Sequence, residues 1–255
     1  MDNSPLIQVR DLTAGYQDEV ILNNISFDIY RGEIFIILGA SGCGKSTLLK
    51  HMIGLYRPRR GKILIDGMDI VTTEGRGRLQ IVRKFGVLFQ SNALLSSMTL
   101  AENVALPLRE YTRLPRETID FVVRAKLSMV GLRGYEGYLP DQLSGGMKKR
   151  AGIARAMALD PEILFFDEPS AGLDPVSSVN LDDLIMQLSA SLGTTMVVVT
   201  HELSSIYTIA QRVIMLDKRT KKIIAEGHPV DLRDKSEDPF VRDFFNRKVR
   251  EGFYD

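Results

Sequence analysis

A glycine-rich segment close to the N-terminus, Gly39-Ala-Ser-Gly-Cys-Gly44-Lys45-Ser46, carries the clearest chemistry of the chain. It matches the pattern G-x-x-x-x-G-K-[ST], in which backbone N–H groups and a following helix N-terminus surround a phosphate. Lys45 would reach the β- and γ-phosphates of a nucleotide, and Ser46 would give a hydroxyl to Mg²⁺. We interpret the Cys43 thiol as a small filler, because only its backbone is needed there. The segment predicts a nucleoside triphosphate site.

The elements on either side of this segment support the prediction. Ile34–Leu38 is uniformly apolar, as a strand buried on both faces of a parallel sheet should be, and Lys45–Ile53 has a helical pattern. The alternative is a glycine turn with a surface lysine, which needs neither a buried strand before it nor a helix after it. Strand, glycine-rich loop and helix in that order favour phosphate binding.

A second chemical feature is a pair of carboxylates, Asp167 and Glu168, directly after the apolar run Ile163–Phe166. Ligand sites of parallel sheets lie at the carboxyl ends of the strands. Asp167 would hold Mg²⁺ directly or through water, and Glu168 would deprotonate or orient the attacking water. The alternative, exposed charges at a strand end, is weakened by the phosphate-binding pattern elsewhere in the chain.

The elements that must position these residues alternate along the chain. Three segments rich in β-branched residues predict a partly antiparallel sheet near the N-terminus: Ile7–Val9, Val20–Tyr30 and Ile63–Ile65. Further buried strands are expected at Gly86–Phe89, Ile163–Phe166, Met196–Val199 and Val213–Leu216, with a helix at Val176–Ser191. This alternation predicts an α/β core.

The region between Asn92 and Asp160 differs from that core. It has helical patterns at Arg116–Val130 and Gly146–Leu159, and no buried strand pattern interrupts it. We interpret it as an inserted helical subdomain.

Composition narrows the functional classes. The 255 residues include 33 basic and 32 acidic side chains, so the net charge of +1 gives no general attraction to nucleic acid or an anionic membrane. One cysteine suits a reducing compartment. The opening segment lacks the pattern of a secretory signal, so we expect the mature chain to start near Met1 in the cytosol. The charge-free runs Phe85–Ala101 and Leu184–Thr200 contain too many polar residues to predict membrane spans.

A third motif, Leu143-Ser-Gly-Gly-Met147, is followed by Lys148–Ala156 and precedes the carboxylate pair. Ser144, Gly145 and Gly146 predict another exposed helix N-terminus suited to an anion. With this motif the chain resembles the ATP-binding subunits of ABC transporters over nearly its whole length. Met147 departs from the glutamine usual in that family, although the anion-binding atoms lie before it.

The resemblance implies a fold and a domain arrangement. It implies a P-loop NTPase (RecA-like) α/β core with an N-terminal antiparallel β subdomain and an inserted α-helical subdomain at about 92–160. The ABC ATP-binding domain would cover 1–237, and 238–255 would form a C-terminal helical tail. In the family two chains sandwich two nucleotides, and the loop at Ser144 of one meets the γ-phosphate held by the other.

The resemblance also implies roles residue by residue. Tyr16 would stack on adenine, Gln90 would contact Mg²⁺ and the attacking water, and His201 would bond the γ-phosphate. Asp174 would make a polar contact in the loop between the two sites. The implied ATP-binding residues are Tyr16, Gly39, Ala40, Ser41, Gly42, Cys43, Gly44, Lys45, Ser46, Thr47, Ser144, Gly145, Gly146 and Asp174. The implied catalytic residues are Lys45, Gln90, Glu168 and His201, and the implied Mg²⁺ residues are Ser46, Gln90 and Asp167.

Within the family, Leu88–Met98, Asn103–Glu110 and Met147 are most similar to ATPases of Mla-type, MCE-associated lipid transporters. This implies a peripheral subunit on the cytoplasmic face of the inner membrane, driving movement of phospholipid or another hydrophobic molecule. Its partners would be a second copy of the chain, a polytopic permease, an MCE-domain protein and a small cytoplasmic accessory protein, with no nucleic acid. The permease would dock around Ala93–Met98 and Leu106–Leu108, although such apolar residues are more often core than interface.

Two alternatives remain at this stage. One is the ATPase of another ABC system, such as a polar-solute importer or a lipoprotein releaser. The other is a non-transport ABC ATPase, which usually has tandem cassettes, a coiled-coil insertion or a basic surface.

The C-terminal segment predicts a short helix from Asp238, with Pro239 at its first position. Its apolar stripe comprises Phe240, Val241, Phe244, Phe245 and Val249. This stripe would pack either on the chain's own core or on a partner.

Overall fold

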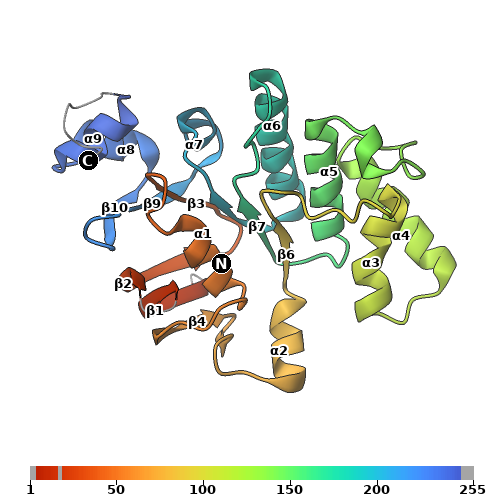
Figure 1. The fold of residues 1–255 in the computed structure, drawn as a ribbon, viewed down its shortest axis with the longest axis horizontal. Helices are drawn as coiled ribbons and strands as arrows, with labels where there is room; N and C mark the ends of the chain where they lie inside the picture. The colour runs from red at the N-terminus through yellow and green to blue at the C-terminus, as the bar shows by residue number, and fades with distance from the viewer. Residues whose placement is uncertain (1–3, 17–18, 248–255) are drawn as a thin grey trace. The chain divides into compact units, whose positions relative to one another are not determined.

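The computed structural model describes residues 4–16 and 19–247 (Figure 1). The chain forms two compact units, Met1–Glu74 with Val197–Asp255 and Gly75–Met196. It leaves the first unit after Glu74 and returns within strand β8 (Thr195–Val199). We describe each unit in turn.

The first unit opens with an antiparallel sheet in the order β2-β1-β4-β5. Its strands are β1 (Pro5–Tyr16), β2 (Glu19–Tyr30), β4 (Arg60–Ile65) and β5 (Met68–Asp69). Ile7 pairs with Ile29 on one side and with Ile65 on the other, and all three side chains are fully buried. The predicted antiparallel subdomain is confirmed, and its strands are longer than the sequence pattern indicated.

The same unit contains the strand that precedes the glycine-rich loop. β3 (Ile34–Gly39) is buried throughout and runs parallel to β9 (Arg212–Leu216), with Ile36 opposite Val213. β10 (Ile223–Gly227) is antiparallel to β9, and α1 (Lys45–Met52) follows β3. A continuous apolar strand needs cover on both faces, which explains why its pattern shows no alternation.

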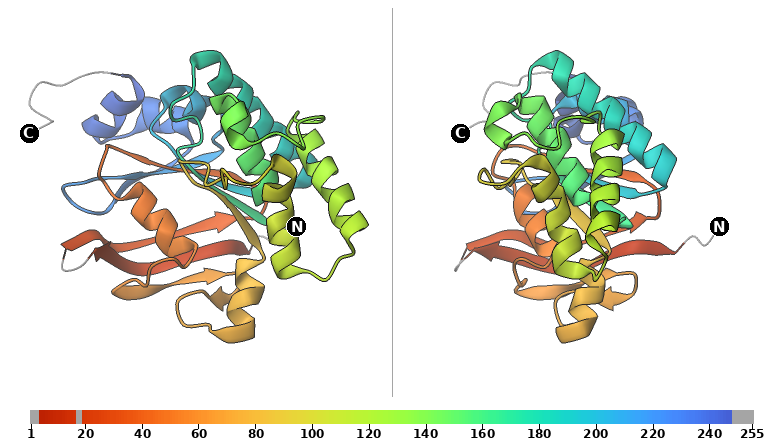
Figure 2. Two further views of the ribbon diagram at one scale, coloured as in Figure 1. Left: turned by 45° about the vertical axis from the view of Figure 1, so that its right-hand side comes forward. Right: turned by 90° about the vertical axis from the view of Figure 1, so that its right-hand side faces the viewer.

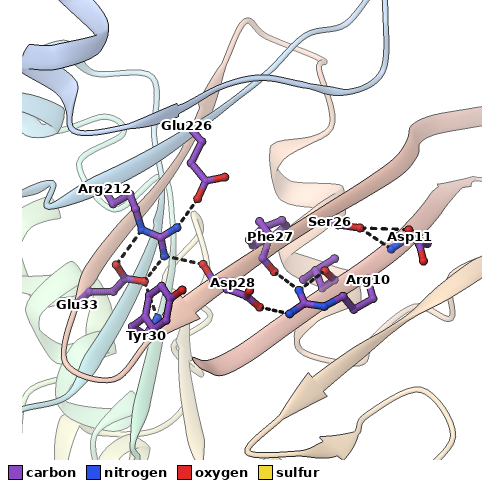
Figure 3. Close-up of polar contacts among 10 residues, drawn as sticks. Arg10, Asp11, Ser26, Phe27, Asp28, Tyr30, Glu33, Arg212 and Glu226 are labelled. Carbon is purple, nitrogen blue, oxygen red and sulfur yellow. Dashed lines mark hydrogen bonds and ion pairs between the residues drawn. The ribbon is translucent and has the colours of Figure 1, made fainter. Parts of the chain in front are cut away.

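Arg212 joins three segments of this unit (Figure 3). Its guanidinium donates to the Glu33 carboxylate and to the Asp28 carbonyl, both at 2.6 Å, and also pairs with Glu226. The central carbon of the guanidinium (Cζ) lies 5.1 Å from the centre of the Tyr30 ring, within range of a cation–π interaction. Burial disfavours the charged form, but the hydrogen bonds that Arg212 donates to Glu33 and Glu226, with the charges of these carboxylates, raise the pKa of Arg212. Arg212 therefore fastens β9 to the end of β2 and the following turn.

The second unit contains the predicted helical region. β6 (Phe85–Leu88) and β7 (Ile163–Asp167) are parallel neighbours, and helices occupy the chain between them. These helices are α3 (Leu100–Tyr111), α4 (Arg116–Met129), the short 3₁₀ helix η1 (Pro140–Gln142) and α5 (Gly145–Ala156). α2 (Gly75–Val82) precedes β6, and α6 (Pro175–Leu192) follows β7. Helices α3, α4 and α5 gather side by side (Figure 2).

The C-terminal helices belong to the first unit. They are α7 (Leu203–Ile209), α8 (Pro229–Lys235) and α9 (Pro239–Phe245). The predicted start of the last helix is confirmed, because the Asp238 side chain accepts the Phe240 N–H at 2.8 Å. Val241 and Phe245 are buried, and the Tyr207 hydroxyl donates to the Phe245 carbonyl at 2.8 Å. Val241 and Phe245 of the predicted stripe thus pack within this chain. Val249 lies outside the described residues.

Across residues 4–16 and 19–247, we find no helix long and apolar enough to cross a membrane.

Candidate functional site

The glycine-rich loop of the first unit adopts a backbone that its glycines make possible. Gly39, Gly42 and Gly44 have φ of 147°, 75° and 102°, in the region that L side chains rarely enter. A Cβ on Gly44 would lie 2.7 Å from Cγ2 of Ile21, so a side chain is also excluded there by contact. α1 begins at Lys45, so its N-terminus lies directly at the end of this loop. The arrangement presents backbone donors to an anion, as the sequence predicted.

Lys45 is folded back onto the loop that carries it. Its side chain is 8% exposed, and Nζ donates to the carbonyls of Gly39 at 2.8 Å and Ala40 at 3.2 Å. These acceptors are neutral, so an anionic acceptor can replace them favourably. Ser46 follows as the second residue of α1, next to that charge. The loop fits a polyphosphate.

Cys43 lies inside the loop and is buried. Burial raises the pKa of the thiol, and the nearby Lys45 only partly opposes this. A Cβ on Gly39 would lie 2.6 Å from the Cys43 sulfur, which shows how tightly the thiol fills the space. The structure agrees with a filler and not with a nucleophile.

Tyr16 stands at the end of β1 with its side chain exposed. Its hydroxyl accepts a hydrogen bond from Oγ1 of Thr47 at 3.3 Å, which ties it to α1. Tyr56 packs edge-on against the Tyr16 ring, with centroids 5.4 Å apart. The ring is thus held beside the phosphate-binding helix, where a base could stack on it.

His201 follows β8 and is exposed. The residue before it, Thr200, is fully buried, and its N–H donates to the Ile37 carbonyl of β3 at 3.3 Å. The Thr200 hydroxyl accepts the Glu202 N–H at 3.1 Å, which shapes the turn. The first unit therefore fixes His201 to the end of the strand that leads into the phosphate loop.

The second unit carries the carboxylate pair. Asp167 ends β7, and Glu168 follows it with a left-handed backbone, φ 48°. Both side chains are buried. In the described part of the chain, no group of three or more His, Cys, Asp or Glu residues could hold a metal ion. One carboxylate with hydroxyl and amide oxygens suits Mg²⁺, which keeps several of its waters.

Gln90 is exposed just after β6. Its backbone carbonyl accepts a hydrogen bond from Lys149, a residue that the sequence patterns did not mark. Nζ of Lys149, on α5, donates to the Gln90 carbonyl at 2.7 Å and to the Glu168 carbonyl at 3.4 Å. Burial lowers the pKa of Lys149, while the charges of Asp167 and Glu168 oppose the shift. The structure therefore brings two predicted catalytic residues onto one ammonium group.

The loop at Ser144 begins α5. The exposed Ser144 is the N-cap, and its Oγ accepts the Met147 N–H at 3.3 Å. Gly145 and Gly146 form the first turn, where unbonded backbone N–H groups face outward. The predicted exposed helix N-terminus is present, although Met147 itself is only half-buried.

Asp174 caps α6. Its carboxylate accepts from the N–H groups of Val176 at 3.1 Å and Ser177 at 3.0 Å, and from the Ser177 hydroxyl at 2.6 Å. The hydrogen bonds from Ser177 lower the pKa of Asp174. Within this chain Asp174 therefore stabilises a helix terminus.

Residues 22–171 match the sequence model of the family described as ABC transporter. The chain belongs to this family.

Relatives of this ABC transporter ATPase carry different names. The "Probable ribonucleotide transport ATP-binding protein mkl" of Mycobacterium leprae is 44% identical over 240 residues, covering 94% of this chain and 68% of the relative. The "Intermembrane phospholipid transport system ATP-binding protein MlaF" of Escherichia coli is 43% identical over 242 residues, covering 94% and 88%.

Solved structures show the same fold. A dimeric post-hydrolysis ATP-binding cassette bound to ADP and Pi has a TM-score of 0.79 and 31% identity, covering 87% of this chain and 98% of that one. The cbiO1 protein of Clostridium perfringens, part of the cbiONQ transporter complex, has a TM-score of 0.82 and 29% identity, covering 91% and 92%. This ABC ATPase thus binds and hydrolyses ATP to drive transport, as its family does.

Two residues that contact predicted site residues were not singled out from the sequence, Tyr56 and Lys149. Tyr56 looks like any surface tyrosine of a loop, because its contact with Tyr16 joins segments that are distant in sequence. Lys149 stands beside Lys148 in a basic run, and nothing in the sequence distinguishes the buried lysine from its neighbour.

Proposed function

We propose that this ATPase powers the transport of phospholipid or another hydrophobic molecule by an MCE-associated membrane complex. The observation that carries the proposal is the 43% identity to the Escherichia coli MlaF protein over 94% of this chain. The chain would act as a peripheral subunit on the cytoplasmic face of the inner membrane, bound to a polytopic permease and an MCE-domain protein.

In this proposal the residues divide the work of ATP hydrolysis. The phosphate loop and Lys45 bind the phosphates, and Tyr16 stacks on the adenine. Glu168 orients the attacking water and accepts its proton, and His201 donates to the γ-phosphate. Ser46, Gln90 and Asp167 would hold Mg²⁺, which when bound neutralises charge on the phosphate oxygens.

Two copies of the chain would complete the sites. The exposed N-terminus of α5 at Ser144 is well suited to bind an anion held by a second chain, and a related cassette was solved as a dimer. Glu168→Gln protein with MgATP should sediment as a dimer, because ATP remains bound between the copies. A Glu168→Gln protein that stays monomeric with MgATP, with and without the permease, would contradict this arrangement.

A permease-docking surface is proposed at Ala93–Met98. Asn103 of α3 holds this loop: its amide donates to the carbonyls of Leu95 and Met98 at 3.1 and 3.0 Å and accepts the Leu95 N–H at 2.8 Å. Leu95 is 42% exposed, whereas Leu108 is 3% exposed and therefore belongs to the core. An apolar side chain on a firmly held loop suits a protein contact.

Leu95→Glu tests this surface, with Leu108→Glu as the matched control. Leu95→Glu should abolish co-purification with the permease while ATP affinity and thermal stability stay close to wild type. Leu108→Glu should unfold the protein, because a buried charge has no partner there. If Leu95→Glu also unfolds, the loop is core and the surface is misassigned.

The cargo is tested by affinity purification of the intact complex from membranes. A permease together with an MCE-domain protein supports lipid transport, and a soluble solute-binding protein supports a polar-solute importer. The name of the Mycobacterium leprae relative favours ribonucleotide transport as the second candidate. ATPase activity of the reconstituted complex, measured with phospholipid vesicles and with added ribonucleotides, separates the two.

For the domains, we propose 1–237 as the ATP-binding domain, with its helical subdomain at about 92–160, and 238–255 as a tail. Burial of Val241 and Phe245 supports a tail that packs on its own unit. A small accessory protein would then meet other surfaces of the tail.

A further inference from the structure

Lys149 is a buried charge in the second unit. Its side chain is 3% exposed, on the face of α5 that packs against the segment after β6. A buried ammonium group is costly unless it is hydrogen-bonded and compensated by opposite charge. The acceptors it uses are the backbone carbonyls of Gln90 and Glu168, and the carboxylates of Asp167 and Glu168 supply the compensating charge.

The segment around Gln90 needs such support. Asn92 and Ala93 both have left-handed backbones, with φ of 63° and 50°, a conformation that costs energy in residues other than glycine. Arg155 of α5 donates to the carbonyls of Asn92 at 3.1 Å and Ala93 at 2.5 Å. α5 therefore holds three carbonyl groups of this segment, at Gln90, Asn92 and Ala93, with two cationic side chains.

Close approach of α5 to this segment depends on Gly152. A Cβ there would lie 2.5 Å from Cδ1 of Leu88 and 3.5 Å from the Asn92 carbonyl oxygen. Lys149, Gly152 and Arg155 follow at three-residue intervals, so they share one side of the helix. The contacts of this helix side thus reach from Leu88 to Ala93.

Glu168 is held by the same ammonium group. Its left-handed backbone, φ 48°, turns the chain directly after β7, and its carbonyl accepts from Ala171 N–H at 3.2 Å as well as from Lys149. The direction of the Glu168 side chain follows from this backbone conformation. A change in Lys149 would therefore alter where the carboxylate points.

We propose that Lys149 is a positioning residue for ATP hydrolysis, which sets Glu168 and Gln90 relative to each other through their carbonyl oxygens. The inference rests on the proposed roles of those two residues. It assigns to Lys149 no contact with nucleotide. Its effect should therefore fall on the rate of the chemical step and leave ATP affinity nearly unchanged.

The test compares Lys149→Met, Lys149→Arg and the control Lys148→Met in the full-length ATPase. Lys149→Met removes the charge and the donor at nearly constant length, and we expect kcat to fall about 10- to 100-fold, the usual cost of a displaced catalytic group. The dissociation constant for ATP should change less than about threefold. Lys149→Arg keeps a cation with several donors and should recover most of the lost kcat.

Lys148→Met controls for loss of a positive charge on the same helix, and it should leave kcat and ATP affinity unchanged. Thermal unfolding of every variant is recorded alongside. If Lys149→Met does not fold, Lys149→Gln, which keeps a donor without the charge, replaces it under the same criteria. A kcat within about twofold of wild type, or a loss of ATP affinity that matches the loss of kcat/KM, would overturn the proposal.

Glu168→Gln separates this inference from the role on which it rests. If Glu168→Gln retains turnover, the assignment of Glu168 as the catalytic base is wrong, and Lys149 has no catalytic residue to position there. If Glu168→Gln abolishes turnover while Lys149→Met does not lower it, only the positioning role of Lys149 is wrong. In the Glu168→Gln background, Lys149→Met should cost less than in wild type, because both act on the same step.

Discussion

Two buried lysines, one in each unit, do different work. Lys45 donates to carbonyls five and six residues away, within its own loop. Lys149 donates to carbonyls 59 and 19 residues away, on two other segments. We propose that Lys45 exchanges its neutral partners for an anion, whereas we infer that Lys149 holds two backbone segments in place. A buried cation can thus be a ligand-binding group or a structural link, and its acceptors decide which.

The largest expected effect tests what Lys149 is inferred to position. Glu168→Gln should lower turnover by about 10²- to 10⁴-fold, the usual contribution of a positioned base. ATP binding should persist, since the substitution removes a carboxylate and leaves the phosphate loop intact. Single-turnover hydrolysis and equilibrium ATP binding measure the two effects. Near-normal turnover would show that another group activates the water.

Lys45→Ala should show the opposite kinetic signature to Lys149→Met. Removing the ammonium takes away charged hydrogen bonds to phosphate, each worth about 1.5–3 kcal/mol, so ATP affinity should fall by about 10- to 100-fold. Lys50→Ala, on the same helix but directed toward Tyr56, serves as the control and should bind ATP normally. An unchanged ATP affinity of Lys45→Ala would show that Lys45 does not bind phosphate, and the proposed difference between the two lysines would be wrong.

Phe245→Ala tests tertiary packing in the first unit. Phe245 is buried and packs against Tyr207, with ring centroids 6.1 Å apart, so truncation should cost about 3 kcal/mol. The melting temperature should fall by several degrees, at about 2–4 °C per kcal/mol. Phe121→Ala is the matched control, because Phe121 is 67% exposed. Equal melting temperatures for the two variants would favour partner docking of the tail.

Gly152→Ala tests the contact between α5 and the segment after β6. The added methyl would overlap the buried Leu88 side chain, and we expect a loss of about 1–3 kcal/mol in unfolding free energy. Gly137→Ala, where nothing lies within 4 Å of the added Cβ, should be neutral. Chemical denaturation measures both. Turnover of Gly152→Ala should fall with ATP affinity retained, as for Lys149→Met.

The smallest effect concerns His51, buried on α1 behind the phosphate loop. Burial lowers the pKa of His51 below its usual 6.5, although the Thr47 carbonyl opposes the shift. Below pH 6.5 His51 therefore binds a proton in the unfolded chain more readily than in the folded chain. As the pH falls, the free energy of unfolding declines by at most about 1.4 kcal/mol per pH unit. Denaturation of His51→Gln from pH 7 to 5 should show a shallower decline, and an unchanged slope would contradict the burial argument.

The fold could be predicted well because its signals are periodic and local. The sequence predicted the uniformly apolar strand β3, the alternation of strands and helices, and the helical stretch between β6 and β7. Element ends were less so: β1 continues to Tyr16 because it pairs along its length with β2, and pairing partners are not encoded in a strand's own pattern. Helix α3 was not assigned a pattern, although its Thr99–Glu102 capping box marks its start.

By itself the sequence determined the phosphate loop, the carboxylate pair and the glycine-started helix at Ser144. Each of these depends on consecutive residues, whose types dictate backbone conformation and which donors face outward. Only the tertiary structure decided which lysine of α5 is buried, and that Val241 and Phe245 of the last helix are buried within this chain. Lys148 and Lys149 are identical in type and adjacent in the chain. What separates them is the segment that folds against one side of their helix, and that contact is a property of the three-dimensional packing.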